Sequence, residues 1–328
     1  MIQWDNILID AGRAAIGIPA AAYAMSALGL NLQFGYTGLL NFGHVAFMLV
    51  GAYGTAITVD LGGSLWLGIP VGIAVAALLG LLLGFPTLRL RTDYLAIVTI
   101  AAGEILRLIV RSSGAEPLTN GVFGIQAFAD EFFDLNPIVD GRYGIGRFRF
   151  DERTLWVLIA AWALVALGTW IIWKLTRSPW GRVIRSIRED EDAARSLGKN
   201  VFWYKLQSLM IGGAYGALAG IILAVDQQNV SADFFIPLLT FYAYTIVILG
   251  GPGTVFGPIL GSILFWFLFE LFDEFLFDAV AAGWFGDVIE TTDVGAIRFA
   301  AVGVGLMLLM AFRPQGIFGK REEVLLDV

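Results

Sequence analysis

Nine runs of mainly apolar residues follow one another along the chain, and this feature constrains the fold most. Most runs have about the 20 residues that an α-helix needs to cross the hydrocarbon core of a bilayer, whereas the run 237–250 is short. The sequence therefore predicts an all-α integral membrane protein, with residues 1–328 forming a single polytopic transmembrane domain of about 8–10 membrane segments. The runs are 14–33, 38–59, 64–85, 93–111, 155–175, 204–225, 237–250, 256–277 and 297–312.

The composition agrees with a membrane location and excludes several kinds of chemistry. Hydrophobic residues make up 58% of the chain and charged residues 15%, whereas soluble domains average about 45–50% apolar and about 25% charged residues. The chain has no cysteine and one histidine, His44, so the sequence offers no disulfide and no cysteine or histidine cluster for a metal. It also lacks a phosphate-binding loop and a nucleophile motif. We therefore expect no enzymatic activity, no catalytic or metal-binding residue, and no nucleotide bound by this chain.

Charged residues beside the apolar runs predict the orientation of the chain, because basic loops stay in the cytoplasm. Segment 176–203 and the C-terminus are predicted to be cytoplasmic. The acid-rich segments 112–154 and 278–296 are predicted to lie outside, and so is the N-terminus if every run spans once. The basic residues that support this orientation are Arg89, Arg91, Arg177, Arg182, Arg185, Arg188, Arg195, Lys199, Lys205, Arg313, Lys320 and Arg321.

Small residues recur at every fourth position in three places. In lipid, such stripes let helix backbones approach closely. Scattered glycines are common in membrane helices, but three stripes in register favour a tightly packed bundle. The stripes are Gly68, Gly72, Ala76, Gly80 and Gly84, then Gly212, Gly216 and Gly220, and finally Gly253, Gly257 and Gly261.

The stretch 178–200 is the longest strongly charged run, and it joins two apolar runs. Read as a helix, Arg182, Arg185 and Arg188, with Ala193 and Leu197, do not separate into one apolar and one polar face. Acidic residues follow directly, and neighbouring charges of both signs suit a docking surface for a soluble partner. A solvated cytoplasmic loop is the alternative interpretation.

Two apolar segments carry polar or glycine-rich interruptions. Asn41 and His44, with Gly43 between them, lie inside the second run, and polar groups at this depth tend to face a cavity or the bundle interior. Gly253 and Gly257 interrupt the chain between the seventh and eighth runs. One such segment in each half of the chain indicates two related halves and a pathway near the middle of the membrane.

A third polar group within an apolar run is Glu104. On a helix it shares a face with Arg107 and Arg111. Glu104 can therefore be a residue of the pathway or a gate, or it can form an internal ion pair with Arg107.

Three sequence motifs resemble those of the branched-chain amino acid permeases of ATP-binding-cassette (ABC) importers. Residues 35–53, GYTGLLNFGHVAFMLVGAY, resemble the family pattern GxxGLLxxGHxAFxxxGAY, and residues 250–262 resemble GGxGTxxGPxxGA with Ser262 in place of the final alanine. The resemblance covers about residues 35–316. Its most specific part is the family's cytoplasmic coupling loop, carried here by Gly181, Arg185, Ile187, Arg188, Glu189, Asp190, Glu191, Ala193, Ala194, Ser196, Leu197 and Gly198.

The resemblance implies a permease subunit that forms the path for branched-chain amino acids in a prokaryotic plasma membrane. By resemblance, it would pair with a homologous second permease, two ATPase subunits that bind ATP and Mg²⁺, and an external solute-binding protein. Membrane lipid would surround the complex, and nothing points to nucleic acid. The residues that the resemblance assigns to ATPase coupling are Gly181, Arg185, Arg188, Glu189, Asp190, Glu191, Ala194 and Gly198, and those of the candidate pathway are Asn41, Gly43, His44, Glu104, Gly253 and Gly257.

Three alternatives stay open at this point. A permease for urea or short-chain amides differs only in substrate. A secondary transporter driven by an ion gradient would use Glu104 or His44 as a proton site and would act without partners. A purely structural membrane protein would not need two interrupted helices.

Overall fold

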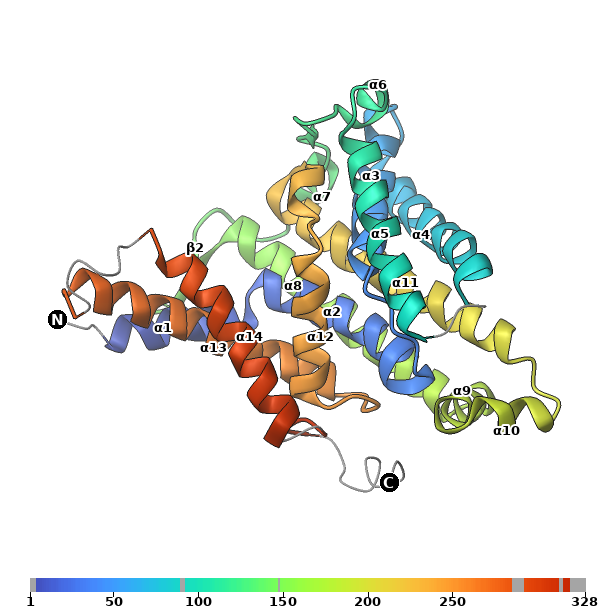
Figure 1. Ribbon diagram of the computed structural model, residues 1–328. Helices are drawn as coiled ribbons and strands as arrows, with labels where there is room; N and C mark the ends of the chain where they lie inside the picture. Colours follow the sequence, from blue (N-terminus) through green and yellow to red (C-terminus); the bar gives the residue numbers. More distant parts are fainter. Residues whose placement is uncertain (1–3, 89–91, 147, 285–291, 313–314, 319–328) are drawn as a thin grey trace.

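The computed structural model describes residues 4–88, 92–146, 148–284, 292–312 and 315–318. Helices dominate these residues (Figure 1). The helices are α1 (Trp4–Ile16), α2 (Ile18–Asn31), the π-helix η1 (Leu32–Tyr36), α3 (His44–Asp60), α4 (Leu65–Thr87), α5 (Thr92–Arg111), α6 (Glu116–Thr119), α7 (Asp130–Asp134), α8 (Glu152–Arg177), α9 (Pro179–Glu189), α10 (Glu191–Ser196), α11 (Val201–Gln227), the 3₁₀ turn η2 (Ala232–Phe234), α12 (Leu238–Gly250), α13 (Gly257–Ala281) and α14 (Val294–Phe312). The strands are β1 (Ile125–Gln126), β2 (Arg142–Ile145), β3 (Phe148–Asp151) and β4 (Asn229–Val230).

Helices cover most of each of the nine predicted runs, which confirms the all-α fold class and a multi-pass membrane protein. The first run is divided between α1, α2 and η1, and the second begins with the non-helical residues 38–43. Among the described residues, α4, α8 and α11 are each long and apolar enough to cross a bilayer alone. The pair formed by α1 and residues 18–36 also qualifies, with a bend of 42°. The bend falls where Gly17 precedes the proline at the start of α2, because proline cannot continue the hydrogen-bond ladder of a helix. The helix α1 itself was not predicted.

The centre of the bundle is α2. Apart from Pro19, all residues of this helix are buried, and it packs against α8, α11, α12 and α13. Its sequence is apolar on every side and rich in alanine, as expected of a helix surrounded by other helices. The helix continues directly into η1, so the first interrupted segment starts at the core of the bundle.

Two of the three predicted small-residue stripes pack as expected. The stripe of α4 supplies most of the buried residues of that helix and faces α3 and α11, and the stripe of α11 faces α2 and α3. The prediction of the third stripe is wrong for its first residue, Gly253. Gly253 lies in a turn before α13 with φ of +78°, so it continues no helical stripe.

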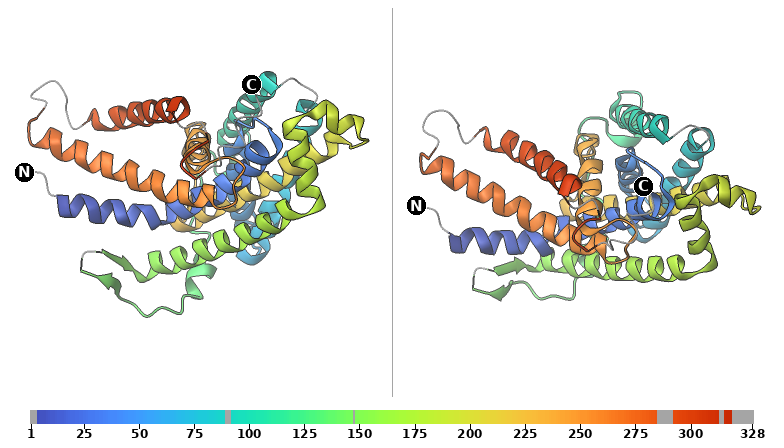
Figure 2. Two further views of the ribbon diagram at one scale, coloured as in Figure 1. Left: turned by 90° about the horizontal axis from the view of Figure 1, so that it is seen from below. Right: turned by 60° about the horizontal axis from the view of Figure 1, so that its bottom comes forward.

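The predicted outer loop 112–154 is not a plain loop. It contains α6 and α7 and the hairpin formed by β2 and β3, and its strand β1 pairs with β4 after α11. The pairing between β1 and β4 therefore fastens this segment to the end of α11. Figure 2 shows the hairpin and the N-terminus at one end of the molecule and α9 and α10 at the other.

The basic residues Arg89, Arg91, Arg313, Lys320 and Arg321, which support the predicted orientation, lie outside the described residues.

Replacing Asp151 with alanine is expected to lower the free energy of unfolding by about 1 kcal/mol at neutral pH, because Asp151 caps the N-terminus of α8. One carboxylate oxygen accepts a hydrogen bond from the Thr154 backbone N–H at 3.2 Å, and the other accepts one from the Thr154 hydroxyl at 2.7 Å. The Thr154 hydroxyl is the main cause that holds the pKa of Asp151 below its ordinary value. Unfolding of the detergent-solubilised protein would be followed from pH 7 to pH 3 for both proteins.

The pH dependence has a definite sign. A carboxyl whose pKa is depressed in the folded state contributes stability above its unfolded pKa, about 3.9, and loses it as the pH falls through the folded pKa. The difference in stability between wild type and Asp151→Ala should therefore shrink in acid. A difference that stays constant from pH 7 to pH 3 would contradict the role of the ionised cap.

Candidate functional site

The first interrupted segment, residues 38–43, lies between η1 and α3 and is held by side-chain hydrogen bonds. Asn41 is buried, and its Nδ2 donates to Gln33 Oε1 at 3.0 Å. Its Oδ1 accepts from the Gly43 N–H at 3.1 Å. The Asn41 amide thus replaces the helical hydrogen bonds that the break removes, which an interrupted segment within a bundle requires.

Gly43 and His44 mark the start of α3. Gly43 lies so close to α5 that a Cβ there would overlap the carbonyl of Thr99. His44 is fully buried and packs against Gly216 of α11 and the ring of Phe47. Among the described residues, neither of its ring nitrogens has a hydrogen-bond partner. Both residues therefore lie in the bundle interior, one of the two environments predicted for them.

The second interrupted segment, residues 251–256, joins α12 to α13. Thr254 organises it: its hydroxyl donates to Gly251 O at 2.8 Å and accepts from the Gly257 N–H at 3.1 Å. Gly253 donates its N–H to Asn31 Oδ1 at 2.8 Å. The two glycines predicted from the sequence, Gly253 and Gly257, are thus both fixed through backbone N–H groups.

The end of α2 and the π-helix η1, which directly precede the first interrupted segment, contact the second one. Asn31, at the end of α2, accepts from Gly253 N–H and also donates its Nδ2 to Thr254 O at 2.8 Å. Gly35 of η1 lies against Gly253 so closely that a Cβ would overlap its nitrogen. Residues far apart in sequence therefore form one polar cluster.

The charged stretch 178–200 folds into two short helices, α9 and α10, that form an elbow between α8 and α11 (Figure 1). Ser178 caps α9 and Asp190 caps α10, where Asp190 Oδ1 accepts from Asp192 N and Ala193 N at 2.9 Å each. Gly198, with φ of +76°, follows the end of α10. Caps at the start of each helix and a glycine after the second define the bend.

The prediction that this stretch lacks an apolar face is wrong for α9. Gly181, Ile184 and Ile187 are buried on one side of α9, whereas Arg182 and Glu189 are exposed. The two isoleucines form this face, which the arginines, Ala193 and Leu197 do not reveal by themselves. The elbow is therefore amphipathic and rests on the bundle through its apolar side.

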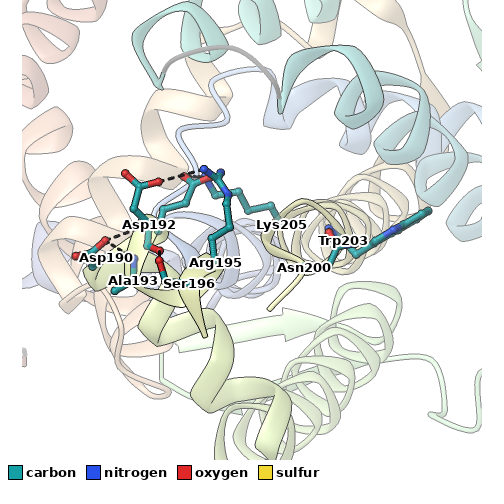
Figure 3. Close-up of polar contacts among 9 residues, drawn as sticks. Asp190, Asp192, Ala193, Arg195, Ser196, Asn200, Trp203 and Lys205 are labelled. Carbon is teal, nitrogen blue, oxygen red and sulfur yellow. Dashed lines mark hydrogen bonds and ion pairs between the residues drawn. The ribbon is translucent and has the colours of Figure 1, made fainter. Parts of the chain in front are cut away.

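Several predicted coupling residues hold the elbow together rather than face outward. Glu191 pairs with Lys205 of α11 and with Arg195 at 2.9 Å, and Arg195 also pairs with Asp192 at 3.1 Å (Figure 3). Ala194 is buried with Ile187. Among the predicted coupling residues, Gly181 and Ala194 are buried and Glu191 is half-buried, whereas Arg185, Arg188, Glu189, Asp190 and Gly198 are exposed.

The elbow is attached to η1 and, where Arg188 lies against Gly38, to the start of the first interrupted segment. Arg188 Nη1 donates to Gly35 O, and the Arg185 guanidinium lies over the Tyr36 ring at 5.2 Å from its centre. Ile184 packs with Leu32 and Tyr36 in one apolar cluster. The candidate coupling residues Arg185 and Arg188 thus contact η1, which leads into the segment that carries Asn41 and Gly43.

Glu104 lies apart from this cluster and forms the predicted ion pair. Its carboxylate binds Arg107 through two hydrogen bonds, of 2.6 and 2.9 Å. Asp233 of η2 pairs with Arg107 at 3.3 Å and with Arg111 at 3.0 Å. The geometry supports the ion-pair interpretation, and a role of Glu104 in the pathway stays a prediction.

Sequence reasoning missed several polar residues that organise the site. Asn31 and Gln33 stand in the first apolar run, and Thr99 and Thr240 stand in later ones. The sequence does contain a signal for these residues, because a polar side chain inside an apolar run is energetically costly in a membrane and usually has a structural or functional role. Thr99 Oγ1 accepts from Phe42 N at 3.1 Å, Thr240 Oγ1 accepts from Val45 N at 3.0 Å, and Gln33 Nε2 donates to Leu209 O at 3.1 Å.

This arrangement defines a multi-pass membrane protein with two interrupted helices in contact and an amphipathic elbow fastened to one of them. The sequence model of a family described as "Branched-chain amino acid transport system / permease component" matches residues 14–310. The chain therefore belongs to the branched-chain amino acid transport system permease family, which confirms the family predicted from its motifs.

Individual relatives agree with this family. The chain is 33% identical to the high-affinity branched-chain amino acid transport system permease protein LivM of Escherichia coli, over 96% of this chain and 72% of the relative. It is 26% identical to a probable LivM of Methanocaldococcus jannaschii over 92% of each chain. It is also 22% identical to the permease LivH of Escherichia coli, over 92% of each.

Proposed function

We propose that this chain is the permease subunit of an ABC importer and forms the path for branched-chain amino acids across a prokaryotic plasma membrane. It works with a homologous second permease, two ATPase subunits and an external solute-binding protein. ATP and Mg²⁺ bind to the ATPase subunits and not to this chain. The names of the relatives support this assignment, and Escherichia coli has both a LivM and a LivH that resemble the chain, which supports pairing with a second, different permease.

The elbow formed by α9 and α10 is the observation that carries the proposal. It protrudes at one end of the molecule, opposite the hairpin of β2 and β3 (Figure 2). Its inner side packs on η1, and its outer side carries exposed charges and the exposed Leu197. A partner that grips the outer side can therefore move the first interrupted segment directly.

Contacts of the last described residues support a cytoplasmic C-terminus. Residues 315–318 follow α14, and Ile317 donates its N–H to Leu249 O at 2.9 Å, beside the second interrupted segment. That segment touches Gly35, which binds Arg188 of the elbow. The end of the described chain thus lies on the side of the elbow, where the ATPase subunits would bind.

In the proposed mechanism, ATP closes the ATPase subunits and displaces the elbow. The displacement passes to the two interrupted segments, which belong to two related halves of the chain. The solute crosses near Asn41, Gly43 and His44 on one segment and Gly253 and Gly257 on the other. Backbone at interrupted helices offers hydrogen-bonding groups to a polar solute within the membrane.

Uptake into proteoliposomes tests the proposal. The complex would be purified after co-expression with the proteins encoded beside this chain, and labelled leucine would be supplied outside with ATP inside. We expect uptake that requires ATP and the solute-binding protein, and competition by isoleucine and valine but not by urea. Uptake by this chain alone, driven by a proton gradient and abolished in Glu104→Gln, would overturn the assignment in favour of a secondary transporter.

A further inference from the structure

Three segments of the chain meet at Gly35. Its carbonyl oxygen accepts a hydrogen bond from Arg188 of α9. On the other side of the same residue, a Cβ would overlap Asn31 Oδ1 and Gly253 N. Only glycine leaves room for both contacts, so the elbow and the second interrupted segment hold the π-helix η1 from two sides.

Asn31 completes this junction. Its side chain is fully buried, at 0% exposure, and it makes two hydrogen bonds of 2.8 Å to consecutive residues, accepting from Gly253 N–H and donating to Thr254 O. An amide supplies one acceptor and one donor group in a fixed orientation, whereas a carboxylate of the same shape can only accept. The pair of contacts is therefore specific for asparagine.

The junction extends on both sides. Through Thr254, whose hydroxyl accepts from Gly257 N–H at 3.1 Å, it reaches the first turn of α13. Through Arg188 it reaches α9, where Ile184 adds apolar contacts to η1. A continuous chain of contacts thus joins the elbow to both interrupted segments.

We infer that Asn31 is a positioning residue for transport: with Gly35 and Arg188 it forms a linkage through which the elbow and the two interrupted segments move as one unit. This inference rests on the proposed ATP-driven transport and adds a device that no resemblance assigns. If the linkage is broken, the ATPase subunits still close and displace the elbow, but this displacement is no longer transmitted to the second interrupted segment. ATP hydrolysis then continues while solute uptake falls.

A double-mutant cycle tests the linkage, because contiguity alone does not demonstrate coupling. The measured quantity is solute transported per ATP hydrolysed, for wild type, Asn31→Asp, Arg188→Gln and the double variant. Each single variant should lower this ratio at least about fivefold, the lower end of typical coupling between sites. The double variant should be no worse than the poorer single one, since both break the same linkage.

Matched controls separate the linkage from general damage. Asn200→Asp makes the same chemical change at the N-cap of α11, where aspartate caps as well as asparagine. Arg149→Gln removes an exposed charge from β3, in the hairpin at the opposite end of the molecule from the elbow (Figure 2). Both controls should keep the wild-type ratio. Unchanged ratios in Asn31→Asp and Arg188→Gln, or losses that multiply in the double variant, would overturn the inference.

A distance measurement keeps the test valid if Asn31→Asp fails to fold. The chain has no cysteine, so spin labels can be placed at Ser196→Cys on α10 and Phe256→Cys before α13, both exposed positions. In the otherwise wild-type complex, the distance between labels should stay the same with and without ATP, and in Arg188→Gln it should change. If the distance between the labels changes on ATP binding in the complex that retains Arg188, the linkage is refuted. Absence of ATP-driven uptake in the wild type would instead refute the proposed function.

Discussion

Replacing Leu197 with aspartate is expected to weaken binding of the ATPase subunits at least about 30-fold, the equivalent of about 2 kcal/mol for the loss of a central apolar contact. Leu197 follows α10 at the bend of the elbow and is 78% exposed. Leu197 lies among the exposed charges of the elbow, so an ATPase subunit that docks on this outer side would cover it. ATP-driven uptake should fall accordingly, while the permease itself stays folded.

The measurement is co-purification of the ATPase subunits with the permease, followed by titration of the purified components. Leu61→Asp is the matched control, because Leu61 is 72% exposed in the turn that joins α3 to α4, away from the elbow. It should bind the ATPase subunits as wild type does. Equal binding by Leu197→Asp and Leu61→Asp would contradict the assignment of the elbow as the docking surface.

Replacing Gly220 with alanine is expected to lower the free energy of unfolding by about 1–3 kcal/mol, the usual cost of overpacking. Gly220 of α11 lies against the backbone of Met48 in α3, and a Cβ would overlap the Met48 carbonyl. Backbone cannot move aside as the end of a flexible side chain can. The helices α3 and α11 would therefore have to separate.

Thermal unfolding in detergent measures this effect, with Gly305→Ala as the control. Gly305 lies in α14 with open space where its Cβ would be, so the same substitution should be neutral or slightly stabilising, since alanine favours helix by about 1 kcal/mol over glycine. If both variants lose the same stability, close approach of α3 and α11 is not the cause.

Much of the fold could be predicted because the features that direct a segment into a membrane lie within short stretches of sequence. A bilayer requires apolar runs of a given length, and most residues of each of the nine runs are helical in the structure. The positions of both interruptions also followed from local signals, namely Asn41 and Gly43 in one run and the glycines around Gly253 between two others.

The candidate site could be predicted only in part. Local pattern located the elbow but assigned Arg188 and Glu191 to an outward surface. In the structure, Arg188 binds Gly35, 153 residues away, and Glu191 binds Lys205 across the elbow. The sign of a charge is visible in a sequence, but its partner is not.

The sequence by itself determined the membrane helices, their interruptions and the family, because hydropathy, glycine placement and motifs depend on neighbouring residues. Only the tertiary structure decided which residues contact the second interrupted segment and what the elbow holds. The hydrogen bond from Gly253 to Asn31 spans 222 residues, and no local pattern specifies such a pair. It forms because two partly buried backbone groups outside a helix need hydrogen-bond partners within the bundle, and the packing of α2 against α12 and α13 places one amide within reach of both.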